Sequence, residues 1–303
     1  MDWIAASLIV AATMALVNVI DSHMISKRVP SLWAYLLPVG VLQLTYGVIV
    51  LVIHPLPEGV EAFPWVTVAI SAVTRTAAIT LMLYAMRTEE VSRIIPVTNT
   101  YPVFVALMAV PLLGESLVAL QWLAIFMTVA GAVLISIKGG SGGKGAGLRR
   151  SFVLLLLSSV LFGVANTATK YALGYISFWN MYALNALCFG GAFFLMSARV
   201  SVFRELRQMQ GRGAVLTLLG INETIALGAA VLSFWAMERG PIALVSTIMA
   251  ARPFFVFLFA VALSRAFPAV LDERLTRGIA VLKIVSIALI IGGVAIINLV
   301  AGT

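Results

Sequence analysis

The segment YAMRTEEVSRIIPVTNTYPVFV, residues 84–105, aligns without gaps with WAMERGPIALVSTIMAARPFFV, residues 235–256. The two segments share Ala-Met near the start and Pro-x-Phe-Val at the end, five identities in 22 positions. Each segment begins at the end of one long apolar run and continues into the next run. A match of this kind predicts an internal repeat that relates the two halves of the chain.

The runs around these segments have the length that crosses a bilayer as a helix, roughly 20 residues. Of the 303 residues, 62% are hydrophobic and 11% are charged, and the mean hydropathy is +1.08. Soluble domains carry about 25% charged residues, so the sequence predicts an all-α membrane protein. Ten transmembrane helices are expected, at residues 3–22, 32–53, 64–86, 92–113, 117–137, 151–173, 177–198, 214–237, 241–264 and 278–299.

The middle of the chain is a glycine-rich linker, KGGSGGKGAGLRR, residues 138–150. Such composition is typical of flexible connections. It separates a first repeat, residues 1–137, from a second repeat, residues 151–303. Five helices per repeat is an odd number, so the second repeat is expected to be inverted in the membrane. Inverted repeats are typical of secondary transporters, with the substrate in a central cavity between the repeats.

Lysines and arginines gather in alternate loops. Five alternate connections hold fifteen of the 20 cations, whereas the remaining connections and both termini hold only Arg239. The positive-inside rule therefore predicts that the basic loops, including the linker, are cytoplasmic and that both termini lie outside a cell (inner) membrane. These dispersed cations form no continuous basic face, so no nucleic-acid partner is expected.

The sequence offers no constellation for catalysis or metal binding. Cys188 is the single cysteine, and the two histidines, His23 and His54, lie near the ends of different spans. Neither a disulfide framework nor a metal site can be built from them. We therefore expect no metal, no cofactor and no enzymatic activity.

The stretch PLLGESLVALQWLAIFMTVAGAVLI, residues 111–135, resembles the junction of the fourth and fifth helices in EamA-type transporters of the drug/metabolite transporter superfamily. The similar features are the Gly-Glu turn at Glu115 and the small residues of the helix that follows. Residues 272–297 resemble the same junction in the second half, with Glu273 in the place of Glu115.

FGVANTATKYAL, residues 162–173, resembles the opening of the family's repeat, including its terminal lysine, here Lys170. The first half has Asp21 and Ser22 where that lysine would be expected. The resemblance implies ten helices and a carrier whose cavity is lined mainly by helices one, three, four, six, eight and nine. It implies no particular substrate.

Three charged residues, Arg75, Glu223 and Arg252, fall near the middle of their spans. A charge at the centre of a membrane helix costs about 3 kcal/mol, so these side chains are expected to face the cavity. Two guanidinium groups and one carboxylate leave one cation for an anionic substrate group, which the planar fork of Arg suits. Alternatively, Glu223 pairs with one Arg and only pins two helices together.

Further residues are predicted around this site. Pro102 and Pro253 occupy matching positions in the two repeats and predict helix kinks, either functional or for packing. Asp21, Lys170 and Glu223 are candidates for gating or coupling, although Asp21 and Lys170 would also fit residues that snorkel at helix ends. Tyr84 and Trp235 would equally fit aromatic anchors at the membrane interface. The candidate lining residues are Asn99, Tyr101, Asn222, Tyr84 and Trp235.

These features predict a secondary transporter that exports a small organic anion or an amphipathic metabolite by alternating access. The alternatives are a flippase for a phosphate-bearing lipid or lipid-linked intermediate, and a multidrug exporter. The expected partners are a small-molecule or lipid substrate and the bilayer, with the chain as a monomer or homodimer. Gly131, Gly292 and Gly293 indicate close helix packing, within one chain or between two.

Overall fold

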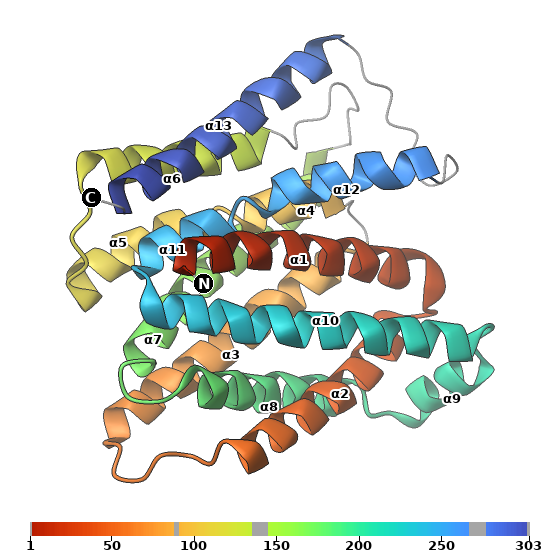
Figure 1. Ribbon diagram of the computed structural model, residues 1–303. Helices are drawn as coiled ribbons and strands as arrows, with labels where there is room; N and C mark the ends of the chain where they lie inside the picture. Colours follow the sequence, from red (N-terminus) through yellow and green to blue (C-terminus); the bar gives the residue numbers. More distant parts are fainter. Residues whose placement is uncertain (1, 88–90, 135–144, 267–276, 302–303) are drawn as a thin grey trace.

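The computed structural model describes residues 2–87, 91–134, 145–266 and 277–301, and every secondary-structure element in these ranges is a helix. Most of the predicted linker and Glu273 lie outside the described residues. In chain order (Figure 1) the helices are α1 (Trp3–His23), the π-helical turn η1 (Met24–Arg28), α2 (Leu32–Ile53), α3 (Ala62–Ala85), α4 (Val91–Thr98), α5 (Tyr101–Leu113), α6 (Ala119–Leu134), α7 (Gly145–Ala172), α8 (Phe178–Ser197), α9 (Val200–Gln208), α10 (Arg212–Arg239), α11 (Ile242–Met249), α12 (Arg252–Ala266) and α13 (Arg277–Ala301).

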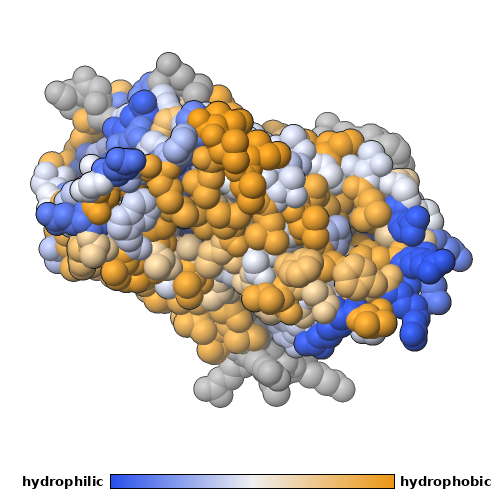
Figure 2. All heavy atoms as spheres, turned by 90° about the horizontal axis from the view of Figure 1, so that it is seen from below, coloured by the Kyte–Doolittle hydropathy of each residue, from blue (hydrophilic) through white to orange (hydrophobic). Residues whose placement is uncertain are grey.

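The bundle has the apolar surface of a membrane protein. Among the described residues, seven helical segments are long and apolar enough to cross a membrane. Figure 2 shows hydrophobic side chains over the middle of the molecule and hydrophilic ones toward its two ends. Helix α1 begins and α13 ends at the same end of the bundle (Figure 1). Three shorter apolar helices, Tyr101–Leu113, Ala119–Leu134 and Ile284–Val300, coincide with the fourth, fifth and tenth predicted spans.

Serine side chains cap the N-termini of two of the spans. Ser31 Oγ accepts a hydrogen bond of 3.1 Å from the Ala34 amide at the start of α2, and Ser177 Oγ accepts one of 3.2 Å from the Asn180 amide at the start of α8. A hydroxyl at this position satisfies an amide that has no partner within the helix. The two helices that these caps begin pack against each other along the bundle.

Two predicted spans are interrupted rather than kinked. The fourth predicted span is divided into α4 and α5, and the ninth into α11 and α12. Pro102 is the second residue of α5, and Pro253 is the second residue of α12. The prediction of a kinked but continuous helix was therefore wrong, because a proline that lacks an amide proton fits the first turn of a new helix. Both interruptions lie in the interior of the bundle.

Helices from the two halves of the chain pack against each other throughout. Helix α2 packs on α8, α3 on α7, α1 on α10, α5 on α11, and α6 on α13. Helix α1 also contacts α11 and α12, so it lies between α10 and the second interrupted span (Figure 1). This arrangement surrounds the centre of the bundle with helices of both halves. Helix α9, on the connection between α8 and α10, was not predicted.

Two glycines bring α6 and α13 into close contact within one chain. A Cβ atom on Gly131 would lie 2.7 Å from the carbonyl oxygen of Ser286, and one on Gly293 would lie 2.7 Å from the carbonyl oxygen of Ala124. Real Cβ atoms essentially never approach backbone atoms so closely. These two glycines therefore serve packing inside the protomer.

We expect Gly293→Ala to lower the melting temperature of the purified protein by several degrees, because overpacking costs roughly 1–3 kcal/mol. Gly228→Ala on α10 is the matched control, since a Cβ atom there would meet nothing within 4 Å. This control should melt at the same or a higher temperature, because alanine favours the helix. Thermal unfolding in detergent measures both, and equal shifts in the two variants would contradict the packing role.

Candidate functional site

A cavity of about 210 Å³ lies at the centre of the bundle. Its lining comes from α1, α3, the two interrupted spans, α7 and α10, as the family resemblance implied, and also from α2 and α8. The polar residues that α2 and α8 contribute are Tyr35, Gln43, Tyr182 and Asn185. These two helices therefore belong to the site, although the sequence analysis did not assign them to it.

Arg75 and Arg252 both line the cavity, but they differ in their partners. Arg75 Nη2 donates hydrogen bonds to Asn166 Oδ1 (2.9 Å) and Thr169 Oγ1 (3.1 Å), and its guanidinium carbon lies 5.1 Å from the centre of the Phe234 ring. Within the described part of the chain, Arg252 makes no hydrogen bond or ion pair, and its Nε is buried without a partner. Arg75 is thus hydrogen-bonded to α7, whereas Arg252 has no hydrogen-bond or ion-pair partner among the described residues.

The carboxylate of Glu223 does not pair with either arginine. Its Oε2 accepts a 2.8 Å hydrogen bond from Gln43 Nε2, and no ion pair joins it to Arg75 or Arg252. The alternative interpretation, in which Glu223 pairs with one arginine and pins two helices together, is therefore wrong for the described residues. The physical reason is that α2 faces the cavity and supplies Gln43 as the partner.

Asp21 is a second buried carboxylate in the cavity. Its Oδ1 accepts hydrogen bonds from Tyr35 Oη (2.6 Å) and Asn222 Nδ2 (2.6 Å). The predicted surplus of one cation therefore does not hold for the cavity as a whole. The described lining contains two arginines and two carboxylates, which makes the formal charge balanced.

Asn99 and Tyr101 lie at the interruption between α4 and α5 and line the cavity as predicted. Tyr101 Oη donates to the carbonyl oxygen of Ser246 (3.2 Å) on α11, so the two interrupted spans are joined. Asn99 is 2% exposed, and its Oδ1 has no hydrogen-bond partner among the described residues. Asn222 is buried behind the cavity wall and acts on Asp21.

Tyr84 and Trp235 lie outside the cavity lining, contrary to the prediction. Tyr84 is 55% exposed. Trp235 lies beneath the Arg239 guanidinium, whose carbon is 4.3 Å from the ring centre. Helical periodicity turns both residues away from the polar faces of their helices. They occupy helix ends, where aromatic side chains are typical of the membrane interface.

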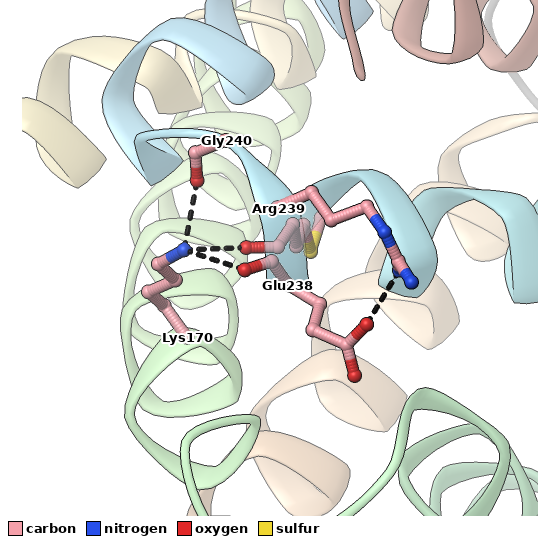
Figure 3. A network of polar contacts seen from close by, with 5 residues as sticks. Lys170, Glu238, Arg239 and Gly240 are labelled. Atoms are coloured by element: carbon pink, nitrogen blue, oxygen red, sulfur yellow. Dashed lines mark hydrogen bonds and ion pairs between the residues drawn. The ribbon is translucent and has the colours of Figure 1, made fainter. Parts of the chain in front are cut away.

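Lys170 does not reach the cavity. Its Nζ donates to the backbone carbonyls of Met237 (2.8 Å), Glu238 (3.2 Å) and Gly240 (2.8 Å), at the end of α10 (Figure 3). A cation at a helix C-terminus satisfies carbonyl groups that have no partner in the helix. Lys170 therefore ties α7 to the end of α10.

Glu115 binds the connection between α10 and α11 from the side of α11. Its carboxylate accepts hydrogen bonds from the amides of Ile242 (2.5 Å) and Ala243 (3.2 Å), in the first turn of α11. The preceding residue, Gly114, has a φ of 67° and ends α5 in the left-handed conformation that glycine adopts at low cost. The connection between α10 and α11 is thus fixed by two charged side chains from other elements.

Several polar residues of the site were missed by the sequence analysis. Gln43, Asn166 and Asn185 each line the cavity and are at most 8% exposed. A signal for them exists, because polar side chains inside apolar spans usually face the interior of the bundle.

The apolar helices around an interior cavity that contains four charged side chains make this chain a multi-pass membrane protein. Residues 1–137 match the model of the EamA-like transporter family. This match confirms the resemblance to a family of membrane transporters for the first half of the chain. A protein known from a crystal structure has a similar fold, with a TM-score of 0.69 and 18% identity over 99% of this chain and 96% of that chain. No curated protein sequence matches the chain.

Proposed function

We propose that this transporter carries a small organic substrate bearing a carboxylate or phosphate group and that it works by alternating access. The observation that carries the proposal is Arg252, a permanently charged side chain in the central cavity without a partner among the described residues. An unpaired cation in a site of low dielectric constant is costly unless an anion or water satisfies it. The anionic group of the substrate would bind there.

Two further features support an anion at this place. Arg252 is the first residue of α12, so it lies at the positive end of that helix. Arg75 lines the same cavity and has its Nε buried without a partner. Interrupted membrane helices whose N-termini face an anionic substrate are a recurrent feature of secondary transporters.

We also propose that residues 1–137 and 151–303 form two inverted five-helix repeats with both termini outside the cell membrane. The packing supports this division, because α1 contacts α10 as α7 contacts α3, while α2 contacts α8 and α6 contacts α13. These pairs are the ones that exchange with each other when the two halves are interchanged. Matching proline interruptions in α4–α5 and α11–α12 support the same relation.

The substrate class is tested by ligand-induced thermal stabilisation of the purified protein, followed by counterflow in proteoliposomes. Carboxylates and phosphate esters are compared with their uncharged amides and with amines of equal size. We expect stabilisation and saturable exchange only from compounds that carry an anionic group, because binding to the native state raises its stability. Stabilisation by amines or uncharged compounds alone would refute the proposal.

A further inference from the structure

The four charged side chains of the cavity form two separate groups. Arg75 and Arg252 form the basic pole, and Asp21 and Glu223 form the acidic pole. All four line one cavity, and no ion pair joins the poles in the described part of the chain. Charges of opposite sign would lower their energy by pairing directly. Their separation leaves both poles available to a ligand.

The acidic pole is held in place on one side only. Both hydrogen bonds to Asp21 end on Oδ1, and the hydrogen bond to Glu223 ends on Oε2. Asp21 Oδ2 and Glu223 Oε1 accept no hydrogen bond from any described residue. Asp21 is 7% exposed and Glu223 is 5% exposed, so bulk water does not surround them. One oxygen of each carboxylate is therefore fixed and the other is free.

Two amides at the acidic pole also lack partners. Asn18 lies one turn before Asp21, lines the cavity, is 3% exposed and has an Nδ2 without a hydrogen-bond partner among the described residues. Asn222 is 1% exposed, and its Oδ1 is a buried acceptor that likewise receives no donor. Buried polar groups in native structures usually have partners. Asn18 Nδ2 is a donor and needs an acceptor, and Asn222 Oδ1 lies behind the cavity wall, so neither amide specifies a cation. The free oxygens of Asp21 and Glu223 are the groups at this pole that a positively charged donor would satisfy.

A single ligand that satisfies both poles at once must carry one group of each charge. A simple anion would neutralise the basic pole and leave two carboxylates uncompensated, whereas a simple amine would leave the arginines uncompensated. We infer that the cavity binds a small zwitterion, with its ammonium group at Asp21 and Glu223 and its carboxylate or phosphate at Arg252 and Arg75. This inference rests on the proposed anion site and adds a cationic group to the same substrate.

The remaining lining residues indicate the chemistry of the uncharged part of this ligand. The cavity wall is mainly apolar, with aliphatic and aromatic side chains from several helices. We therefore expect a hydrocarbon body between or beside the two charged groups, because apolar contact in such a pocket favours binding. Members of this apolar wall include Met14, Ile79, Met82, Phe162, Phe189 and Phe234.

Matched sets of ligands test the inference on the intact protein in nanodiscs. The zwitterions are L-leucine, phosphoethanolamine and ω-amino acids of increasing chain length from glycine to 8-aminooctanoate. Each is compared with the acid that lacks the amine and with the amine that lacks the acid. We expect at least one zwitterion to bind about tenfold or more tightly than both matched compounds. The inference is overturned if no zwitterion binds more tightly than its matched acid.

Asp21→Asn and Glu223→Gln provide a second test with little change of shape. These variants should bind the zwitterion little more tightly than the matched acid. Their affinity for the matched acid itself should be unchanged or higher. Glu58→Gln, in the exposed connection between α2 and α3, is the control and should keep the advantage. An advantage that survives in both cavity variants would contradict the inference. If acids bind through Arg252 and an added amine does not increase their affinity, the inference of a zwitterion is refuted and the proposed function stands. If no compound with an anionic group binds, the proposed function is refuted as well.

Discussion

Arg252→Gln should reduce binding and transport of the anionic substrate by about tenfold or more while the protein stays at least as stable as wild type. A hydrogen bond to a charged group contributes roughly 1.5–3 kcal/mol, which corresponds to a loss of this size. Arg252 has no hydrogen-bond or ion-pair partner among the described residues, so its replacement removes no such interaction from the fold. Loss of function with retained or increased stability is expected for a residue whose role is to bind the ligand.

The measurement combines counterflow in proteoliposomes with thermal unfolding of the same preparations. Arg239→Gln is the control, because Arg239 lies outside the cavity lining and is paired with Glu238. Arg75→Gln should behave differently from both, since it also removes the bonds to Asn166 and Thr169 and should lower the melting temperature. Full transport by folded Arg252→Gln protein would exclude the assigned anion site.

The membrane fold could be predicted from sequence because its determinants are local. Long apolar runs, their basic flanks and a helix cap such as Ser31 depend on neighbouring residues only. The interruptions at Pro102 and Pro253 were located correctly but described wrongly, as kinks. A proline shows where a helix cannot continue, but only the packing around it decides between a bend and a new helix.

The site could be predicted only in part because it depends on which helix faces meet. Charged residues in the middle of a span point inward on energetic grounds, so Arg75, Arg252 and Glu223 were identified as cavity residues. Their partners were not, because Gln43 comes from a helix that carries no charge within its span. The prediction of one surplus cation was wrong because Asp21 lies near the end of its predicted span and was not counted among the cavity charges.

Glu115→Ala is expected to accelerate hydrogen exchange of the Ile242 and Ala243 amides by about tenfold to a hundredfold. The carboxylate accepts from both amides at the start of α11, and no residue of α11 replaces it. Losing a charged acceptor at a helix N-terminus removes roughly 1.5–3 kcal/mol from the closed state of this turn. Exchange measured by mass spectrometry on peptides covering residues 236–250 reports the change directly.

Glu58→Ala is the matched control, because Glu58 is exposed in a connection and should leave this exchange unchanged. Lys170→Met should loosen the same turn from the side of α10, with a smaller effect on the α11 amides because Lys170 binds only carbonyls. Met237, whose carbonyl Lys170 holds, also lines the cavity. Unchanged exchange in Glu115→Ala would show that the connection between α10 and α11 is held by other means.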